Sequence, residues 1–187
     1  MTTIRFVRPS DAQRILEIYR PYVTGTAITF ETEVPSLMAF SQRIQDISAE
    51  YPYLVAEEDG KIVGYAYAHR YRERSAYQWS AELSVYVDRC VTGRGIGSRL
   101  YEVLINLCKK MGLCNLYGIV TVPNMPSERL HEKKGFVRIG TYHKTGYKHG
   151  AWRDVAIFEK RLTDEEMEPG ELLKMDVLKK ALSVAEY

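Results

Sequence analysis

The sequence predicts an α/β (α+β) fold with a mixed central β-sheet flanked by helices. Strand-like and helix-like segments alternate along most of the chain, and antiparallel hairpins are indicated near both ends. In the middle, the apolar run 82–88 ends in a glycine-rich turn that passes directly into a helical pattern. The length of 187 residues is sufficient for a single hydrophobic core.

The first third of the chain predicts a short strand, two helices and a hairpin. Ser10 and Gln13 form a capping-box pattern, and Ser36 is placed to cap the second helix. Asp59-Gly60 is a strong signal for a two-residue hairpin turn. The expected elements are strands at 4–7, 53–58 and 61–71, with helices starting at Ser10 and at Ser36.

The strand expected at 82–88 is followed by alternating elements up to residue 162. A helix that starts at Gly95 should end before Met111-Gly112, because Lys109-Lys110 stand in its last turn, where the helix dipole favours cations. The later expected elements are a strand at 116–122, a helix at 127–134 and strands at 136–142 and 154–162, with an aromatic, basic connection at 146–153 between the last two.

Residue 162 is the expected domain boundary. Residues 1–162 should form the domain, whereas the acidic segment 163–170 is predicted to be a linker. Beyond it, apolar residues recur at near-helical spacing, at Leu172, Met175, Leu178 and Leu182. We therefore expect an amphipathic helix within 163–187 that packs on this protein or on a partner subunit.

Composition excludes several classes of function. The 26 Lys plus Arg against 24 Asp plus Glu give a net charge of +2, which provides no general field for nucleic acid or membranes. The three cysteines have no Cys-x-x-Cys spacing, so neither a disulfide framework nor a metal site is expected. The amino terminus lacks the apolar region of a signal peptide, and we expect a cytoplasmic protein.

The glycine-rich turn Gly93-Arg-Gly-Ile-Gly-Ser98 can place several backbone N–H groups around an anion at a helix start. A P-loop would need Lys followed by Ser or Thr after its last glycine, but Ser98-Arg99 follow Gly97. A dinucleotide fingerprint would need a glycine where Ser98 stands. The turn is therefore interpreted as a diphosphate cradle of another type.

The segment Arg94-Gly95-Ile96-Gly97 resembles the pyrophosphate loop of the GNAT superfamily of N-acetyltransferases. Other segments resemble the phosphinothricin and methionine sulfoximine acetyltransferases of that superfamily, and together they cover roughly residues 3 to 162. These are Tyr65-Ala-Tyr-Ala68, Arg74-Ser-Ala-Tyr77, Glu82-Leu-Ser-Val-Tyr86, Pro123-Asn124, Leu130-His-Glu132, Gly135-Phe136 and Gly146-Tyr-Lys-His-Gly-Ala-Trp-Arg-Asp154. The sequence departs from the family pattern at Thr92, where Gln or Arg is usual.

This resemblance implies a GNAT fold and acetyl-CoA as the acetyl donor. It assigns the diphosphate to the backbone of Gly93, Arg94, Gly95, Ile96, Gly97 and Ser98, and the pantetheine arm to Val85, Tyr86 and Val87. It also implies carrier contacts at Asn124 and Ser127. Without the family, Asn124 could equally be a residue that only ends a strand after proline.

The resemblance further implies a set of substrate-binding residues. These are Phe30, Arg72, Arg74, Ser75, Ala76, Tyr77, Lys148 and His149, the last two across a homodimer interface. Arginine forks suit a carboxylate or phosphinate. The residues alone leave other interpretations open, because Phe30 could fill the core and the arginines could form a solvated charge run.

Two residues are candidates for proton transfer. Glu82 lies three residues before the strand edge assigned to the carrier, where a carboxylate could take an amine proton directly or through water. The alternative is an outward-facing strand glutamate. His131 lies where many members of the superfamily have a tyrosine thought to protonate the departing thiolate, but a packing histidine is an equal alternative.

The predicted function is acetylation of the α-amino group of a small amino-acid analogue, such as phosphinothricin, methionine sulfoximine or methionine sulfone. The enzyme is expected to be a homodimer that uses acetyl-CoA and no metal. Two alternatives are kept. One is an acetyltransferase of protein amino groups, and the other is a non-catalytic sensor that binds acyl-CoA.

Overall fold

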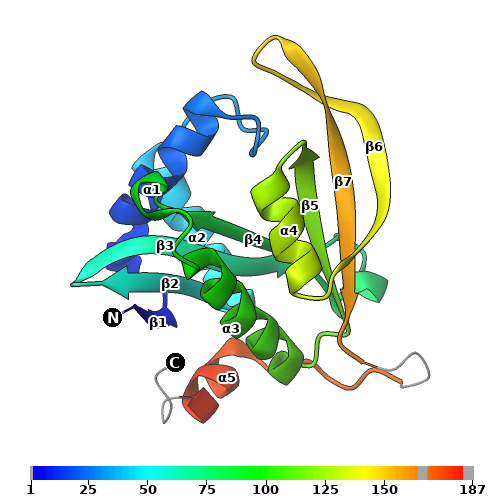
Figure 1. Ribbon diagram of the computed structural model, residues 1–187. Coiled ribbons are helices and arrows are strands. Elements are labelled where there is room, and N and C mark those ends of the chain that lie inside the picture. The colour runs from blue at the N-terminus through cyan, green and yellow to red at the C-terminus, as the bar shows by residue number, and fades with distance from the viewer. Residues whose placement is uncertain (1, 164–167, 183–187) are drawn as a thin grey trace.

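The computed structural model describes residues 2–163 and 168–182 and confirms a mixed sheet flanked by helices (Figure 1). Seven strands lie in the order β1-β2-β3-β4-β5-β7-β6. The strands are β1 (Thr3–Phe6), β2 (Tyr53–Glu58), β3 (Lys61–Arg70), β4 (Ser80–Val87), β5 (Asn115–Val122), β6 (Val137–Lys148) and β7 (Ala151–Arg161). The α-helices are α1 (Ala12–Gly25), α2 (Leu37–Glu50), α3 (Ile96–Met111), α4 (Met125–Lys133) and α5 (Met175–Leu182).

The sheet changes character between β4 and β5. Strands β1 to β4 pair antiparallel with their sequence neighbours, and β5 to β7 form a second antiparallel group. The two groups meet in a parallel pairing whose described register runs only from Ser80 opposite Asn115 to Glu82 opposite Tyr117. Beyond Glu82 the two strands diverge (Figure 1). A strand edge is thus opened inside the sheet rather than at its border.

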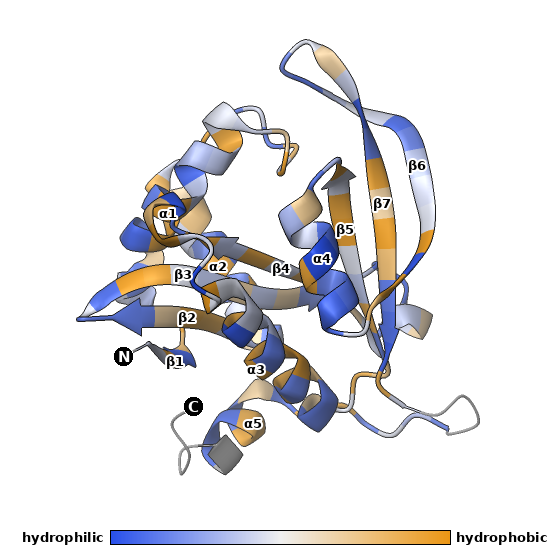
Figure 2. Cartoon of the chain, viewed as in Figure 1, coloured by the Kyte–Doolittle hydropathy of each residue, from blue (hydrophilic) through white to orange (hydrophobic). Residues whose placement is uncertain are grey.

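Helices cover both faces of the sheet. Because side chains alternate along a strand, Leu83 of β4 packs toward α3, whereas Tyr65 of β3 packs toward α1 and α2. Leu104 of α3 is fully buried in the first core, and truncating such a leucine to alanine costs about 2–5 kcal/mol. Figure 2 shows the corresponding hydrophobic stretches in the middle of β5 and β7 and on α3.

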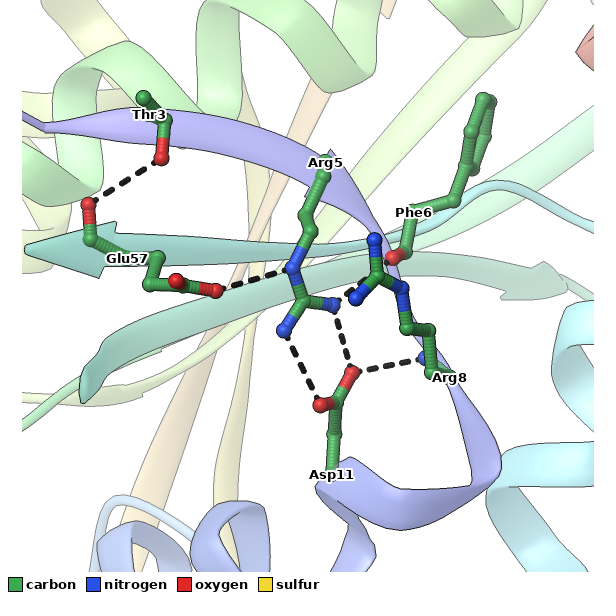
Figure 3. A network of polar contacts seen from close by, with 6 residues as sticks. All are labelled: Thr3, Arg5, Phe6, Arg8, Asp11 and Glu57. Carbon is green, nitrogen blue, oxygen red and sulfur yellow. Dashed lines mark hydrogen bonds and ion pairs between the residues drawn. The ribbon is translucent and has the colours of Figure 1, made fainter. Parts of the chain in front are cut away.

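The entry to α1 differs from the expected capping box of Ser10 and Gln13. Asp11 instead accepts hydrogen bonds from both terminal nitrogens of Arg5, at 2.7 and 3.0 Å, and from the Arg8 backbone N–H at 2.7 Å (Figure 3). Burial alone would raise the pKa of Asp11, but the bonds from Arg5 and Arg8 outweigh it and lower that pKa. Since Arg5 also donates to Glu57, this network fastens α1 to β1 and β2.

The segment 146–153, expected as a connection, is mostly strand. β6 and β7 form one long hairpin whose turn lies at His149 and Gly150, with φ of +50° and +73°. Tyr147 and Trp152 are cross-strand partners with ring centroids 5.3 Å apart. Aromatic cross-strand pairs stabilise a sheet, and a two-residue turn with positive φ suits its twist. His-Gly is a weaker turn signal than Asp59-Gly60, so the two strands of this hairpin were predicted but their extension to the turn at His149 and Gly150 was missed.

The carboxy-terminal segment packs on the same chain. Met175 and Leu178 of α5 are buried in the α3 core, and the Leu173 N–H donates to the Met111 carbonyl at 2.8 Å. The Trp79 indole N–H donates to the Gly170 carbonyl at 2.8 Å. The side chain of Leu182 and residues 164–167 and 183–187 lie outside the described part, and the boundary at residue 162 stays a prediction. Within the described ranges, no helix is long and apolar enough to cross a membrane.

Candidate active site

The glycine-rich turn has the backbone conformation of an anion cradle. Gly93 and Gly95 have φ of +81° and +80°, values that residues other than glycine rarely adopt. α3 begins directly after Gly95, and its first intrahelical bond runs from the Arg99 N–H to the Gly95 carbonyl at 3.1 Å. The N–H groups of residues 96–98 therefore have no intrahelical acceptor and are available to an anion at the positive end of the helix dipole.

Two neighbours define the sides of this cradle. A Cβ at Gly97 would lie 3.3 Å from Cγ2 of Val87, so glycine lets α3 approach β4 closely. Arg94 turns toward β2, where its guanidinium lies 2.9 Å from the Glu58 carboxylate. The cradle is consequently made of backbone atoms, with the Arg94 side chain engaged elsewhere in this structure.

The open edge of β4 follows from the ladder between β3 and β4. The Asp88 N–H donates to the Val63 carbonyl at 2.8 Å, and the register continues unbroken from Gly64 opposite Val87. Because successive residues of an antiparallel ladder alternate in direction, the N–H and carbonyl groups of Val85 and Val87 face away from β3. The Tyr22 hydroxyl accordingly reaches the Val87 carbonyl at 2.6 Å from the other side.

The cradle and the strand edge share a groove of about 580 Å³. Its lining joins the turn before α3, the edge of β4 and the first turn of α4. The residues that resemble the family's carrier site and line this groove are Val85, Val87, Gly93, Gly95, Ile96, Gly97, Ser98, Asn124 and Ser127. Such a groove fits an elongated molecule with a diphosphate at one end and an amide-bearing arm along the strand.

Asn124 and Ser127 stand at the start of α4. The Asn124 side-chain oxygen accepts from the Ser127 N–H at 3.4 Å, and the Asn124 N–H donates to Glu128 Oε1 at 2.8 Å. Asn124 is thus the N-cap of α4, which begins at Met125 rather than at the expected Ser127. The cap uses the side-chain oxygen and leaves the side-chain amide nitrogen unused. Asn124 can therefore cap α4 and also contact a molecule in the groove.

His131 is buried and lines a smaller cavity that shares Val85, Asn124 and Ser127 with the groove, and both of its ring nitrogens are engaged. Nδ1 lies 2.8 Å from the Ser127 carbonyl and Nε2 lies 2.8 Å from the Tyr101 hydroxyl. Burial lowers the pKa of His131, and the bond to the Ser127 carbonyl only partly offsets this. A neutral ring that donates from Nδ1 and accepts at Nε2 satisfies every partner. This arrangement favours the packing interpretation, while a role in thiolate protonation stays a hypothesis.

Glu82 lies on the opposite face of β4 from Leu83 and Val85. It is at the last described position where β4 and β5 pair, opposite Tyr117, and the strands diverge immediately after it. Its side chain is 26% exposed, and Oε1 lies 3.7 Å from Nε2 of His69 on β3. A carboxylate is therefore placed at the point where β4 and β5 separate, and residues just beyond it on both strands, among them Leu83, Val85 and Ile119, line a small cavity.

Stacked tyrosines form the floor on this face. Tyr65 packs against Tyr67 and Tyr86 with ring centroids 6.3 and 5.2 Å apart, and Tyr19 meets Tyr86 at 5.1 Å. Burial raises the pKa of Tyr67 to about 12, with a hydrogen bond from Ser84 opposing the shift. These hydroxyls stay protonated at neutral pH, so the floor adds no charge near Glu82.

The loop between β3 and β4 forms one wall. Tyr71 stacks on Tyr117 at 4.1 Å, and the Arg72 guanidinium lies over the rings of Tyr71 and Tyr77, at 5.1 and 5.3 Å. Since Tyr117 is the strand partner of Glu82, this aromatic platform carries Arg72 toward the same face. The other expected loop residues, Arg74, Ser75 and Ala76, are exposed on a short 3-10 turn.

The hairpin of β6 and β7 forms the other wall with the loop after α1. A Cβ at Gly146 would lie 2.2 Å from the Phe30 ring, which shows how closely the ring covers the strand. Lys148 is buried, donates to the Thr29 carbonyl at 2.8 Å, and has its pKa lowered by burial. His149 Nε2 lies 3.1 Å from the Thr26 carbonyl. Both basic residues thus contact their own chain.

Sequence analysis missed four residues that the structure brings to this region, namely Tyr22, His69, Tyr71 and Tyr117. His69 is the cross-strand partner of Glu82, but this register could not be derived from the hairpin alone because a nine-residue loop of unknown path separates β3 from β4. The alternation of tyrosines in β3 was the available sequence signal for the stacked tyrosines on the Glu82 face.

Among the described residues, no group of three or more metal-ligating side chains comes together.

Comparison with known proteins gives a consistent family. A family model described as an acetyltransferase (GNAT) domain matches residues 4–157. A phosphinothricin N-acetyltransferase of Alcaligenes faecalis is 40% identical over 163 residues, covering 86% of this chain and 82% of that protein. An L-methionine sulfoximine/L-methionine sulfone acetyltransferase of Salmonella typhimurium is 31% identical over 170 residues, covering 89% of this chain and 98% of that protein.

Solved structures agree with this result. A GNAT superfamily phosphinothricin acetyltransferase from Sinorhizobium meliloti, in complex with acetyl-CoA, superposes with a TM-score of 0.88 at 34% identity, covering 91% of this chain and 94% of that chain. A ribosomal-protein-alanine N-acetyltransferase from Brucella melitensis has a TM-score of 0.83 at 31% identity, covering 84% of this chain and 98% of that chain. The named acceptors of these similar proteins thus include both small molecules and a protein.

Proposed function

The chain belongs to the GNAT family of acetyltransferases, and we propose that it transfers the acetyl group of acetyl-CoA to the α-amino group of a small amino-acid analogue. Phosphinothricin, methionine sulfoximine and methionine sulfone are the candidate acceptors. The observation that carries the proposal is the gap between β4 and β5, with the groove on one face of the sheet and the Glu82 carboxylate on the other. A donor and an acceptor can meet there from opposite sides.

In the proposed mechanism, the backbone of β4 and α3 holds the donor. The free N–H groups at the start of α3 bind the diphosphate, and the outward edge at Val85 and Val87 pairs with the amides of the pantetheine arm. The Val85 N–H then donates to the thioester oxygen, where negative charge develops as the amine attacks. No covalent enzyme intermediate is needed.

Glu82 is proposed as the base. An α-amino group is mostly protonated at neutral pH, so it must lose a proton before it can attack the thioester carbon. Glu82 accepts that proton directly or through a water, the new C–N bond forms, and the C–S bond breaks to release the thiolate of coenzyme A. The position of Glu82 beside the strand gap supports this assignment.

The acceptor is proposed to lie between the two walls of the Glu82 face. Arg72, carried on its aromatic platform, and Arg74 would bind the carboxylate or phosphinate, whose planar or tetrahedral oxygens suit guanidinium forks. Phe30 would cover the apolar part of the molecule. The buried Lys148 supports the Phe30 loop from behind through its bond to the Thr29 carbonyl.

We also propose that the enzyme is a homodimer in the cytoplasm. The hairpin of β6 and β7 exposes large apolar side chains, which are Val137, Ile139, Tyr142 and Tyr147 on the outermost strand β6 and Trp152 on β7. Such side chains are the type that dimer interfaces bury. The three cysteines are free, which suits a reducing compartment. Light scattering should give twice the chain mass of 21.5 kDa, and a monomer at micromolar concentrations would contradict the dimer.

The similarity to a ribosomal-protein-alanine N-acetyltransferase makes a protein amino terminus the second candidate acceptor. A panel of amines separates the two. We would measure thiol release from acetyl-CoA with phosphinothricin, methionine sulfoximine, methionine sulfone, lysine and a peptide that begins with alanine. We expect the first three to give the highest kcat/KM.

A higher kcat/KM for the alanine peptide would replace the proposed acceptor class. Binding of acetyl-CoA without turnover of any amine would favour a non-catalytic sensor, because the donor site would then be intact without chemistry.

A further inference from the structure

We infer that His69 is a proton-relay residue that acts through Glu82 and releases the amine proton into a groove beside α2. This inference rests on the proposed function, because Glu82 must first accept a proton from the acceptor amine. The overall chemistry requires such an exit. When an ammonium group is acetylated and the thiolate is protonated, one proton per turnover must leave the site for solvent.

The position of His69 is set by the sheet itself. His69 of β3 and Glu82 of β4 are opposite residues in an unbroken antiparallel register, so both side chains project from the same face. The Nε2 atom of His69 lies 3.7 Å from Oε1 of Glu82. A small side-chain rotation or one water is enough to join them by a hydrogen bond.

The contact made by Nδ1 of His69 determines the protonation of Nε2, the ring nitrogen that faces Glu82. Nδ1 of His69 lies 3.1 Å from the carbonyl of Arg70, an acceptor that requires a proton on Nδ1. In the neutral ring, Nε2 then presents a lone pair to Glu82. An ionised carboxylate and a lone pair are two acceptors without a donor, so the pair is complementary only when it holds one proton. This is the property of a relay.

The surroundings leave His69 open to water. His69 is 31% exposed and lines a groove of about 470 Å³ between β3 and α2. The other charged groups on its walls are Arg43, Asp46, Glu50, Arg70 and Glu73. Arg70 is paired with Glu50 at 2.9 Å and lies 3.7 Å from Glu73.

The remaining neighbours are also engaged with other groups. Arg43 is held by Glu31 at 2.6 Å, and Asp46 accepts from the Gln42 amide at 2.8 Å. The ring of Tyr67, which lies 5.7 Å from the His69 ring, carries a hydroxyl that stays protonated at neutral pH. His69 is therefore the neighbour of Glu82 whose side chain can take up a proton at Nε2 and also reach solvent.

Each transfer conserves charge and needs no further reactant. The ammonium group gives its proton to the Glu82 carboxylate, which becomes neutral. Glu82 then gives the proton to Nε2 of His69, which becomes an imidazolium, and water in the groove removes it. Both residues return to their starting forms, and no electrons change centre.

Chemical rescue tests the relay. In His69→Ala, turnover with saturating acceptor should fall roughly tenfold, which is less than the roughly 10²–10⁴-fold effect of removing a base itself. Acetyl-CoA affinity should not change. Added imidazole should restore part of the lost turnover, because it can enter the groove and take the proton from Glu82. Imidazoles of different basicity should rescue to different extents.

The control is His143→Ala. His143 is 77% exposed on β6 and contacts Asp154 at 3.0 Å, away from Glu82. This variant should keep wild-type turnover and show no response to imidazole. His69→Gln, which keeps a side chain of similar length but cannot relay a proton, should behave like His69→Ala and also respond to imidazole.

Three outcomes would overturn the relay. They are full turnover in His69→Ala, a loss that imidazole does not restore, and full recovery in His69→Gln, which would make the residue a spacer. Failure of the proposed function would look different. In that case wild-type protein would acetylate no amine, or Glu82→Gln would keep full turnover, and the relay would fall with its base.

Discussion

On the α3 face of β4, the candidate site consists mainly of backbone atoms, whereas on the α1 and α2 face it consists of side chains. The face proposed to hold the donor, here called the donor face, offers glycines with positive φ, the free N–H groups of a helix start and a strand edge. The face proposed to hold the acceptor, here called the acceptor face, offers Glu82, Arg72 on its aromatic platform and Phe30 in the loop after α1.

This difference indicates how one fold combines a fixed donor with variable acceptors. Backbone groups persist when side chains change, so the donor face tolerates departures such as Thr92 from the family pattern. The acceptor face depends on the identity of each side chain, and three separate loops contribute to it. Mutations on the two faces should therefore separate donor affinity from acceptor recognition and turnover.

The largest effect is expected at the base. Glu82→Gln keeps the shape of the side chain but cannot accept a proton, so turnover should fall roughly 10²–10⁴-fold while acetyl-CoA affinity stays unchanged. Steady-state kinetics and calorimetry measure the two quantities. Glu102→Gln, which changes an exposed carboxylate paired with Lys134, is the matched control and should keep full turnover. Full turnover in Glu82→Gln would leave deprotonation to water.

In the glycine-rich turn before α3, a mutation is expected to lower acetyl-CoA affinity and to leave turnover nearly unchanged. Ser98 lies in the first turn of α3, and Ser98→Asp would place a carboxylate against the diphosphate. Acetyl-CoA affinity should fall about tenfold or more by charge repulsion, whereas turnover with saturating donor should change little. Ser98→Asn has a similar shape without the charge and should bind normally. Equal affinity of the two variants in calorimetry would mean that this turn does not hold the phosphates.

A smaller effect is expected at the far wall. Gly146→Ala would place a Cβ 2.2 Å from the Phe30 ring, so the ring must move away from the acceptor pocket. The KM for the acceptor should rise about fivefold, which corresponds to ~1 kcal/mol, with acetyl-CoA affinity unchanged. Gly140→Ala on the same strand meets nothing within 4 Å and serves as the control. An equal rise of KM in both variants would assign the effect to the strand rather than to Phe30.

The pH dependence of stability tests the packing interpretation of His131. Its pKa is lowered by burial, so the unfolded chain binds this proton more readily than the folded one. The stabilisation is present above the unfolded value of 6.5 and is lost as pH falls below it toward the lowered folded value. The melting temperature should fall over that window. His131→Gln should lower it at all pH values but flatten the slope. An unchanged slope would assign the pH dependence to other groups.

The smallest effect is expected away from both faces. Trp79→Phe removes the hydrogen bond to the Gly170 carbonyl, worth about 0.5–1.5 kcal/mol, and should lower the melting temperature by roughly 1–6 °C. Acetyl-CoA affinity and acceptor KM should both stay unchanged. A changed acceptor KM would mean that the carboxy-terminal segment also positions the arginine loop.

Local signals predicted the donor face better than the acceptor face. The cradle could be predicted because its glycines and the following helix are contiguous in sequence, and the hairpin at Asp59-Gly60 could be predicted because its turn residues determine it. The contact between His69 and Glu82 depends on a register across a loop, and Phe30 meets Gly146 across more than a hundred residues. Such contacts arise from packing of distant segments, for which one sequence carries no direct signal.

The direction of the backbone groups along β4 has a consequence for amide hydrogen exchange. In the free protein, the N–H groups of Ser84 and Tyr86 face β3 and should exchange slowly, whereas those of Val85 and Val87 face the strand gap and should exchange quickly. Neighbouring residues of one strand would then differ in how strongly their amide hydrogens are protected from exchange. A bound donor should slow the fast pair and leave the slow pair unchanged, so that this single strand records whether the groove is filled.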